Sequence, residues 1–147
     1  MDGRGQEAMP AADRNAAGRV GRARVDGRDE ARAMDPLLIQ IADLPGSERS
    51  RRFEGHAVGD AGISFFVTDA PAGHGPSLHT HPYAEVFAVE EGHVAFTVGD
   101  ATIEAEAGQV VVVPAGIPHK FVNLGPGRSR HLDIHASCTM QSEWLEE

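Results

Sequence analysis

Residues 79–92 read HTHPYAEVFAVEEG, and this stretch carries the strongest indication of the fold. It places two histidines one residue apart, a proline directly after them, and Glu85 three residues further on. An apolar run follows and ends at Gly92. Imidazole and carboxylate groups are strong metal ligands. The stretch therefore joins three candidate ligands to a strand-like apolar pattern.

The spacing of these three side chains excludes a single straight strand. Residues two apart share one face of a strand, so His79 and His81 point the same way. Glu85 lies about 13 Å beyond His81 along a straight strand, whereas the ligands of one metal ion lie only about 3 Å apart. Pro82 cannot donate to a continuing ladder. We therefore expect a hairpin around residues 82–84 that returns Glu85 beside the histidines.

A second segment, GQVVVVPAGIPHKFVN at residues 108–123, supplies a fourth candidate ligand. An apolar strand ends at the turn of residues 114–116, and the next strand begins at His119 after a proline. His119, Phe121 and Asn123 share a face of that strand. Three imidazoles and one carboxylate would satisfy Fe(II), Mn(II), Ni(II), Co(II), Zn(II) or Cu(II), and the set does not select among these metals.

The two segments together resemble the cupin superfamily. The residues that match its two motifs are Gly73-x5-His79-x-His81-x3-Glu85-x6-Gly92 and Gly108-x5-Pro114-x-Gly116-x2-His119-x3-Asn123. The resemblance implies a single jelly-roll β-barrel that holds one divalent first-row transition metal. It also implies metal ligands at His79, His81, Glu85 and His119, with open positions for water, dioxygen or substrate, and a structural role for Asn123.

The rest of the chain from residue 37 onward has the pattern of an all-β domain. Short apolar runs alternate with Gly, Pro and Asp turn signals at a spacing typical of an antiparallel sandwich or barrel. The turn VGDA at residues 98–101 predicts a hairpin. We expect a cupin domain over residues 37–147 with its barrel core at about residues 63–137, and a short C-terminal helix in the closing EWLEE.

The N-terminal segment has a different composition. Residues 1–33 contain seven arginines and six acids, and they lack Ile, Leu, Phe, Tyr and Trp. A segment with so little to bury does not offset the entropy cost of ordering, so residues 1–36 are predicted to be a disordered tail. We favour a tail without function over an arginine-rich interaction arm, because the interleaved acids cancel its field. A third interpretation is that translation begins at Met34.

The composition limits the partners and the compartment. The net charge of −9 argues against sequence-independent binding to nucleic acid or an anionic membrane. The sequence contains no apolar run near the roughly 20 residues that span a bilayer, and its N-terminus lacks a hydrophobic stretch of the signal-peptide type. The single cysteine, Cys138, suits a reducing cytoplasm. We therefore expect a cytoplasmic protein.

The late run HLDIHAS leaves the direction of its side chains open. His131, Asp133 and His135 share one strand face, and Leu132 and Ile134 share the other. Two branched aliphatic residues are the stronger inward signal, so we expect the polar set to face solvent. In the alternative arrangement the polar set lines the pocket, and His135 becomes a candidate acid–base group.

The sequence favours an enzyme over two other functions. A metal in an apolar barrel can serve an oxygenase, an isomerase or a decarboxylase, with Glu85 or His135 as the catalytic group that moves a proton. The alternatives are a non-catalytic small-molecule binder or sensor, and a structural cupin that the metal staples together. The few charged residues assigned to the pocket favour a small neutral or aromatic substrate. A homodimer is expected, because cupin barrels commonly pair through exposed edge strands.

Overall fold

The structure, a computed structural model, describes residues 36–146. The predicted tail therefore lies outside the described residues except for Pro36, and its disorder stays a prediction, as do the domain bounds. The described chain contains two 3-10 turns and eleven strands. These are η1 (Ile41–Asp43), β1 (Gly46–Ser47), β2 (Ser50–Glu54), η2 (Gly55–Ala57), β3 (Ser64–Ala70), β4 (His79–Thr80), β5 (Glu85–Glu91), β6 (His93–Val98), β7 (Ala101–Glu106), β8 (Val110–Val113), β9 (His119–Asn123), β10 (Ser129–His135) and β11 (Glu143–Trp144).

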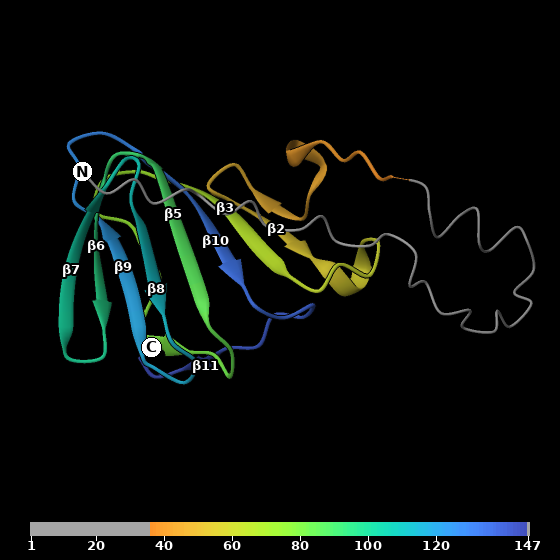
Figure 1. The fold of residues 1–147 in the computed structure, drawn as a ribbon. Coiled ribbons are helices and arrows are strands. Elements are labelled where there is room, and N and C mark those ends of the chain that lie inside the picture. The colour runs from red at the N-terminus through yellow and green to blue at the C-terminus, as the bar shows by residue number, and fades with distance from the viewer. Residues whose placement is uncertain (1–35, 147) are drawn as a thin grey trace, which may run out of the picture. The chain divides into compact units, whose positions relative to one another are not determined.

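The strands form two antiparallel sheets. One sheet has the order β1-β2-β3-β10-β5-β8, and the other has the order β11-β4-β9-β6-β7. Figure 1 shows β5, β10, β3 and β2 side by side in one layer and β7, β6 and β9 in the other. The all-β prediction is confirmed, but the predicted barrel is not closed: the strand pairs form within each sheet, so the described residues make a sandwich.

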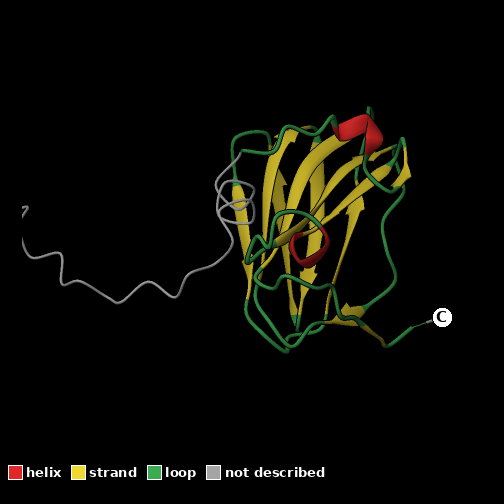
Figure 2. Ribbon diagram, turned by 90° about the vertical axis from the view of Figure 1, so that its right-hand side faces the viewer, coloured by secondary structure: helices red, strands yellow, loops and turns green. Residues whose placement is uncertain are grey.

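Helix is almost absent from the described residues. Figure 2 shows strands and loops with two short helical turns. No helix in residues 36–146 is long and apolar enough to cross a membrane.

The apolar core lies between the two sheets. Side chains alternate between buried and more exposed along β5, β8 and β9, as one face of each strand turns inward. The buried cluster combines residues of both sheets. Its members are Phe87, Val89, Val94, Phe96, Ala105, Val111, Val113 and Phe121. The prediction that His119, Phe121 and Asn123 share one face of their strand is therefore confirmed, because all three are buried.

Two glycines allow the sharp connections of this sandwich. Gly99 has φ +57 in the two-residue hairpin between β6 and β7, which confirms the turn predicted at residues 98–101. Gly92 has φ +91, and a Cβ there would lie 2.7 Å from the backbone oxygen of Arg128. The glycine that ends the opening stretch is thus required both by its backbone conformation and by the close passage of the chain before β10.

The predicted C-terminal helix is wrong. Residues 143 and 144 form β11, which pairs with β4 in the register Glu143↔Thr80 and Trp144↔His79. The N–H of Leu145 donates to the carbonyl oxygen of Leu78 over 2.9 Å. A helix of one turn is costly to nucleate, whereas an unpaired edge of β4 offers backbone hydrogen bonds at once.

Phe65 and Phe66 are adjacent residues of β3 whose side chains lie on opposite faces of the strand. Phe65 stacks on Phe53 of β2, with ring centroids 4.7 Å apart and planes 10° from parallel. Its neighbour Phe66 faces the space between the sheets instead. Because strand side chains alternate, the two adjacent phenylalanines must face opposite sides, and the sequence alone does not say which one faces inward.

Candidate metal centre

The four predicted metal ligands come from both sheets. His79 begins β4 and pairs with His119, the first residue of β9, in one sheet. Glu85 begins β5 in the other sheet, where it pairs with Val113 and His135. The hairpin predicted at residues 82–84 is therefore wrong, because β4 and β5 do not pair. The segment after Pro82 instead carries the chain across from one sheet to the other, and Glu85 meets the histidines face to face.

The structure brings these four side chains into one buried group, as the sequence predicts. One ligand atom from each of His79, His81, Glu85 and His119 lies within 4.8 Å of the others, and all four residues are buried. Glu85 Oε2 lies 3.0 Å from His81 Nε2 and 2.8 Å from His119 Nε2. One carboxylate oxygen thus faces two imidazole nitrogens.

Backbone carbonyls orient the three imidazoles. The Nδ1 atoms of His79, His81 and His119 lie 2.7 Å, 2.6 Å and 2.8 Å from the carbonyl oxygens of Ser77, Gln141 and Ile117. A carbonyl only accepts, so each Nδ1 carries the proton in a neutral ring, and each Nε2 lone pair is left for the group. This arrangement is typical of histidines that bind a metal through Nε2.

The group of four has the donor set that a divalent cation requires. With the proton of each neutral ring on Nδ1, every Nε2 atom is an acceptor, and so is the Glu85 carboxylate. Acceptors this close to one another need a proton or a metal ion between them. His81 Nε2 is buried without a hydrogen-bond partner in the structure. Three imidazole nitrogens and one carboxylate oxygen, all within 4.8 Å of one another, fit a first-row metal.

The electrostatics of the group favour a charged Glu85. Burial by itself raises the pKa of Glu85, but the close imidazoles of His119, His135 and His81 outweigh burial and hold the pKa well below its ordinary value. Burial lowers the pKa of His119, yet its contacts with Glu85 and Ile117 outweigh that effect and raise it. A proton and a metal ion therefore compete for His119 Nε2.

His135 lies inside the sandwich, so the favoured direction for the HLDIHAS strand is wrong. His131, Asp133 and His135 are all buried, while Leu132 and Ile134 are half-buried on the other face. The polar face is tolerated inside because it has partners there. The outer face keeps Leu132 beside Val67 and Ala88, which gives the aliphatic side chains apolar neighbours without a place in the core.

A chain of polar contacts leads from the group to Tyr83. His135 Nε2 lies 3.0 Å from Glu85 Oε1, the carboxylate oxygen that the other histidines do not approach. His135 Nδ1 lies 2.7 Å from the hydroxyl oxygen of Tyr83, which also accepts the N–H of Gln141 over 3.0 Å. The Tyr83 hydroxyl also donates to the carbonyl oxygen of Gln141 over 3.3 Å. The sequence offers Tyr83 either as a packed aromatic, the commoner case, or as a hydroxyl donor, and the structure shows its hydroxyl in these polar contacts.

The C-terminal segment closes the group on another side. Besides the Gln141 carbonyl, the Ser142 hydroxyl lies 3.2 Å from His81 Nδ1, and the Trp144 ring lies 4.9 Å from that of His79. No sequence signal marks these residues as neighbours of the histidines. They are found only because β11 pairs with β4.

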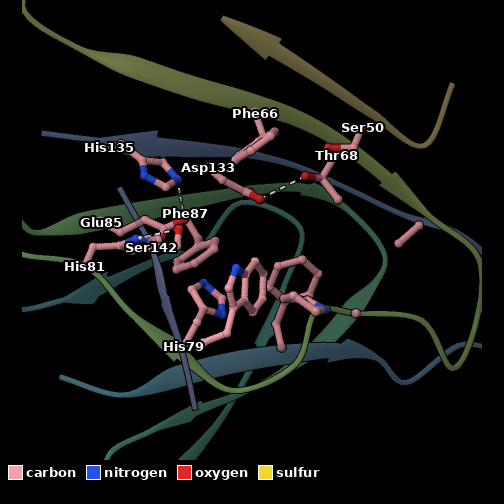
Figure 3. Close-up of a pocket in the computed structure, with 15 residues that line it drawn as sticks. Ser50, Phe66, Thr68, His79, His81, Glu85, Phe87, Asp133, His135 and Ser142 are labelled. Carbon is pink, nitrogen blue, oxygen red and sulfur yellow. Dashed lines mark hydrogen bonds and ion pairs between the residues drawn. The ribbon is translucent and has the colours of Figure 1, made fainter. Parts of the chain in front are cut away.

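A cavity of about 280 Å³ opens beside the group of four (Figure 3). Its walls include His79, His81, Glu85 and His135 on one side and Phe66, Phe87 and Phe121 along its length. Asp133, Thr68 and Ser50 line it as well. The arrangement offers a metal-binding group, an apolar space for a small molecule and a second polar end.

Asn123 has a structural role, as the resemblance implies. Its Nδ2 donates to the carbonyl oxygens of Ala70 and Gly127 over 2.9 Å and 2.8 Å, and its Oδ1 accepts the N–H of Gly125 over 2.8 Å. It fixes the loop between β9 and β10 and is not among the cavity-lining residues.

Fold and site together define a small β-sandwich protein with three histidines and one glutamate gathered between its sheets. The sequence pattern of the cupin domain family matches residues 65–135. The chain therefore contains a cupin domain, as its two motifs predict.

The relatives found by comparison extend beyond this chain. A 62-residue stretch is 46% identical to an uncharacterised protein of Streptomyces coelicolor; it covers 42% of this chain and 57% of that protein. The structure also resembles that of Lactobacillus farciminis oxalate decarboxylase in its formate complex, with a TM-score of 0.65 and 22% sequence identity. The match covers 76% of this chain and 36% of the decarboxylase chain. The chain thus spans little more than half of the curated relative and about a third of the solved decarboxylase.

Two further solved structures show how widely the fold is used. A structure of Bacillus subtilis oxalate decarboxylase, solved for work on its Mn(II) centres, matches with a TM-score of 0.61 and 22% identity. The match covers 69% of this chain and 29% of the decarboxylase chain. Peruvianin-I, a cysteine peptidase from Thevetia peruviana latex, matches with a TM-score of 0.53 and 16% identity. The match covers 57% of this chain and 56% of the peptidase chain. At these identities the likeness concerns the fold alone.

Proposed function

We propose that this protein is a metal-dependent enzyme that acts on a small molecule bound in the cavity between its sheets. His79, His81, Glu85 and His119 hold one divalent first-row metal in this proposal. The observation that carries it is the common orientation of the three imidazoles: each Nδ1 is engaged by a carbonyl, and the rings meet at Glu85. Four protein ligands leave positions free on a metal that takes six.

The bound metal would polarise a substrate oxygen as a Lewis acid or activate dioxygen, which suits a decarboxylase, an isomerase or an oxygenase. The chain's own residues supply the rest. Phe66, Phe87 and Phe121 exclude water from the cavity wall. In this proposal His135, which lines the cavity with its Nε2 3.0 Å from Glu85 Oε1, holds or moves a proton beside Glu85.

The test begins with the metal. Protein expressed with manganese, iron and zinc supplied in parallel is expected to hold close to one equivalent of one of them per chain, measured by elemental analysis after dialysis. Manganese is the first candidate because it occupies the related Bacillus decarboxylase. The loaded protein is then screened for oxygen uptake and carbon dioxide release with small organic acids, phenols and diols. Absence of metal would contradict the proposal at its root.

A metal-stapled structural protein is the second candidate. Glu85 belongs to one sheet and the three histidines lie in or beside the other, so a metal ion there would bridge the sandwich. Metal bound without turnover of any screened compound, together with a large loss of stability on chelation, would favour this function. The predicted homodimer, the metal identity and the cytoplasmic location stay predictions.

His135 and Tyr83 position Glu85 in the proposed site. Replacing His135 with alanine removes the donor that fixes Oε1 and is expected to weaken metal binding about 10–100-fold, the usual effect of losing a group that orients a ligand. Tyr83→Phe should weaken it less, because it leaves His135 beside Glu85 and removes only the hydroxyl contacts to His135 Nδ1 and to the backbone of Gln141. Affinity is measured by competition with a chelator, and the EPR spectrum of bound Mn(II) should change as well.

The conservative variant His135→Gln keeps an N–H donor and should restore most of the affinity. His56→Ala, an exposed histidine that does not line the cavity, serves as control. Unchanged affinity and an unchanged EPR spectrum in His135→Ala would show that Glu85 needs no such support.

A further inference from the structure

The cavity has a second polar end that the proposed metal chemistry does not use. Asp133 lies in the middle of β10, is 3% exposed, and lines the cavity. It pairs across the sheet with Phe66 and Phe87, whereas His135 pairs with Glu85. Asp133 is thus one same-face step, about 7 Å, from His135 along the strand. Figure 3 shows Asp133 pointing toward Thr68 and Ser50, away from the glutamate–histidine group.

The carboxylate of Asp133 keeps acceptor capacity for a ligand. Thr68 Oγ1 donates to Oδ2 over 2.8 Å, and His131 Nδ1 donates to Oδ1. A carboxylate has about four acceptor positions, so these two donors leave about half of them open. Burial raises the pKa of Asp133, and the hydrogen bonds from His131 and Thr68 oppose that effect.

The charges of the cavity wall exclude one class of ligand. Among the described residues that line it, Glu85 and Asp133 are the acids, and neither lysine nor arginine is present. Lys120, Arg128 and Arg130 pair instead with Glu146, Asp69 and Glu90. A dianion would place its second negative group against Asp133 or an apolar wall, where it has no cation to meet.

The rest of the cavity wall is largely apolar and includes three phenylalanines, two of which pair with Asp133 across the sheet. Phe66, Phe87 and Phe121 line the cavity, and no charged side chain other than the two acids and the histidines does so among the described residues. Such walls favour a flat apolar body, with specificity supplied by a few polar groups at its ends.

We propose that the cavity selects a small flat ligand with a coordinating oxygen at the metal end and a hydrogen-bond donor, a hydroxyl or an amine, at the Asp133 end. The metal end rests on the function proposed above. The Asp133 end disfavours ligands long enough to place a second carboxylate beside Asp133, such as terephthalate.

The experiment compares matched probes on the metal-loaded protein, after its metal content has been measured. Benzoate, 4-hydroxybenzoate, terephthalate and oxalate are titrated by calorimetry, with the fluorescence of Trp144, the single tryptophan of the chain and a cavity-lining residue, as a second readout. The hydroxyl of 4-hydroxybenzoate should strengthen binding about tenfold over benzoate, as one hydrogen bond to a charged acceptor does. Terephthalate should bind more weakly than benzoate.

Asp133→Asn should reduce the preference for 4-hydroxybenzoate over benzoate to within about twofold, while Asp69→Asn, a carboxylate on β3 outside the cavity, should leave it unchanged. If Asp133→Asn does not fold, the probe series on the unchanged protein decides alone. Equal affinity for benzoate and 4-hydroxybenzoate, tighter binding of terephthalate than of benzoate, or no binding of any ring probe would overturn the inference. Oxalate, which is short enough to place both carboxylates on the metal, is the control for the metal end alone. A protein without metal would instead overturn the proposed function.

Discussion

Replacing His81 with alanine is expected to abolish stoichiometric metal binding. His81 is held by the Gln141 carbonyl at Nδ1 and presents a buried, unpartnered Nε2 within 3.0 Å of Glu85. Its loss removes one of four donors and leaves Glu85 with one fewer compensating group. Because even residues that only orient a ligand contribute 10–100-fold, the loss of a ligand should weaken binding by more than about 100-fold.

The measurement is metal content after dialysis against a weak chelator, followed by thermal unfolding with and without metal. Wild-type protein should be stabilised by the metal, since a ligand that binds only the folded state adds to its stability, and His81→Ala should not respond. His93→Ala is the matched control, because His93 contacts Glu104 at the surface, away from the group. If the two variants retained equal amounts of metal, the assignment of His81 would be wrong.

Replacing Phe96 with alanine is expected to cost about 3–5 kcal/mol of unfolding free energy, the usual effect of truncating a buried phenylalanine. Phe96 is 1% exposed, and its ring centroid lies 4.8 Å from that of Phe87 and 5.9 Å from that of Phe121. It therefore joins the facing sheets. A loss of this size is a large part of the 5–15 kcal/mol that stabilises a typical domain. Urea denaturation in the presence of a chelator measures it without the contribution of a metal.

Two adjacent valines of β8 provide a matched control for this measurement. Val113 is 1% exposed and Val112 is 60% exposed. Val113→Ala should cost about 2 kcal/mol, as the loss of two buried methyl groups with the cavity they leave, whereas Val112→Ala should stay within about 0.5 kcal/mol. Equal effects at the two positions would mean that β8 does not present the face described for it.

Local spacing, together with the resemblance to the two cupin motifs, identified the four residues that the structure gathers into one buried group. His79 and His81 share a face because strand side chains alternate, and His119 follows a turn that its prolines and glycine mark. The motifs also indicated the right fold family and the structural role of Asn123. The route by which Glu85 joins the histidines was mistaken, since a break at Pro82 signals a turn but does not say which strand the next segment will pair with.

The direction of the β10 side chains shows why burial could not be predicted from apolarity. Leu132 and Ile134 are the stronger inward signal in isolation, yet the inner face carries His131, Asp133 and His135. Asp133 has Thr68 and His131 as partners there, and His135 has Tyr83 and Glu85; Thr68, Tyr83 and Glu85 all lie more than about 40 positions before β10 in the sequence.

Antiparallel strands could be predicted from the sequence, and His79, His81, Glu85 and His119 could be recognised there as candidate metal ligands. These are local properties, set by alternation, by turn residues and by the donor atoms of each side chain. The tertiary structure alone decided that Tyr83 and His135 support Glu85, that the C-terminal segment closes the site as β11 rather than as a helix, and that Asp133 faces the cavity. Each of these depends on which strands pair, and pairing joins residues up to 71 positions apart, as between Ser64 and His135, through contacts that no local pattern records.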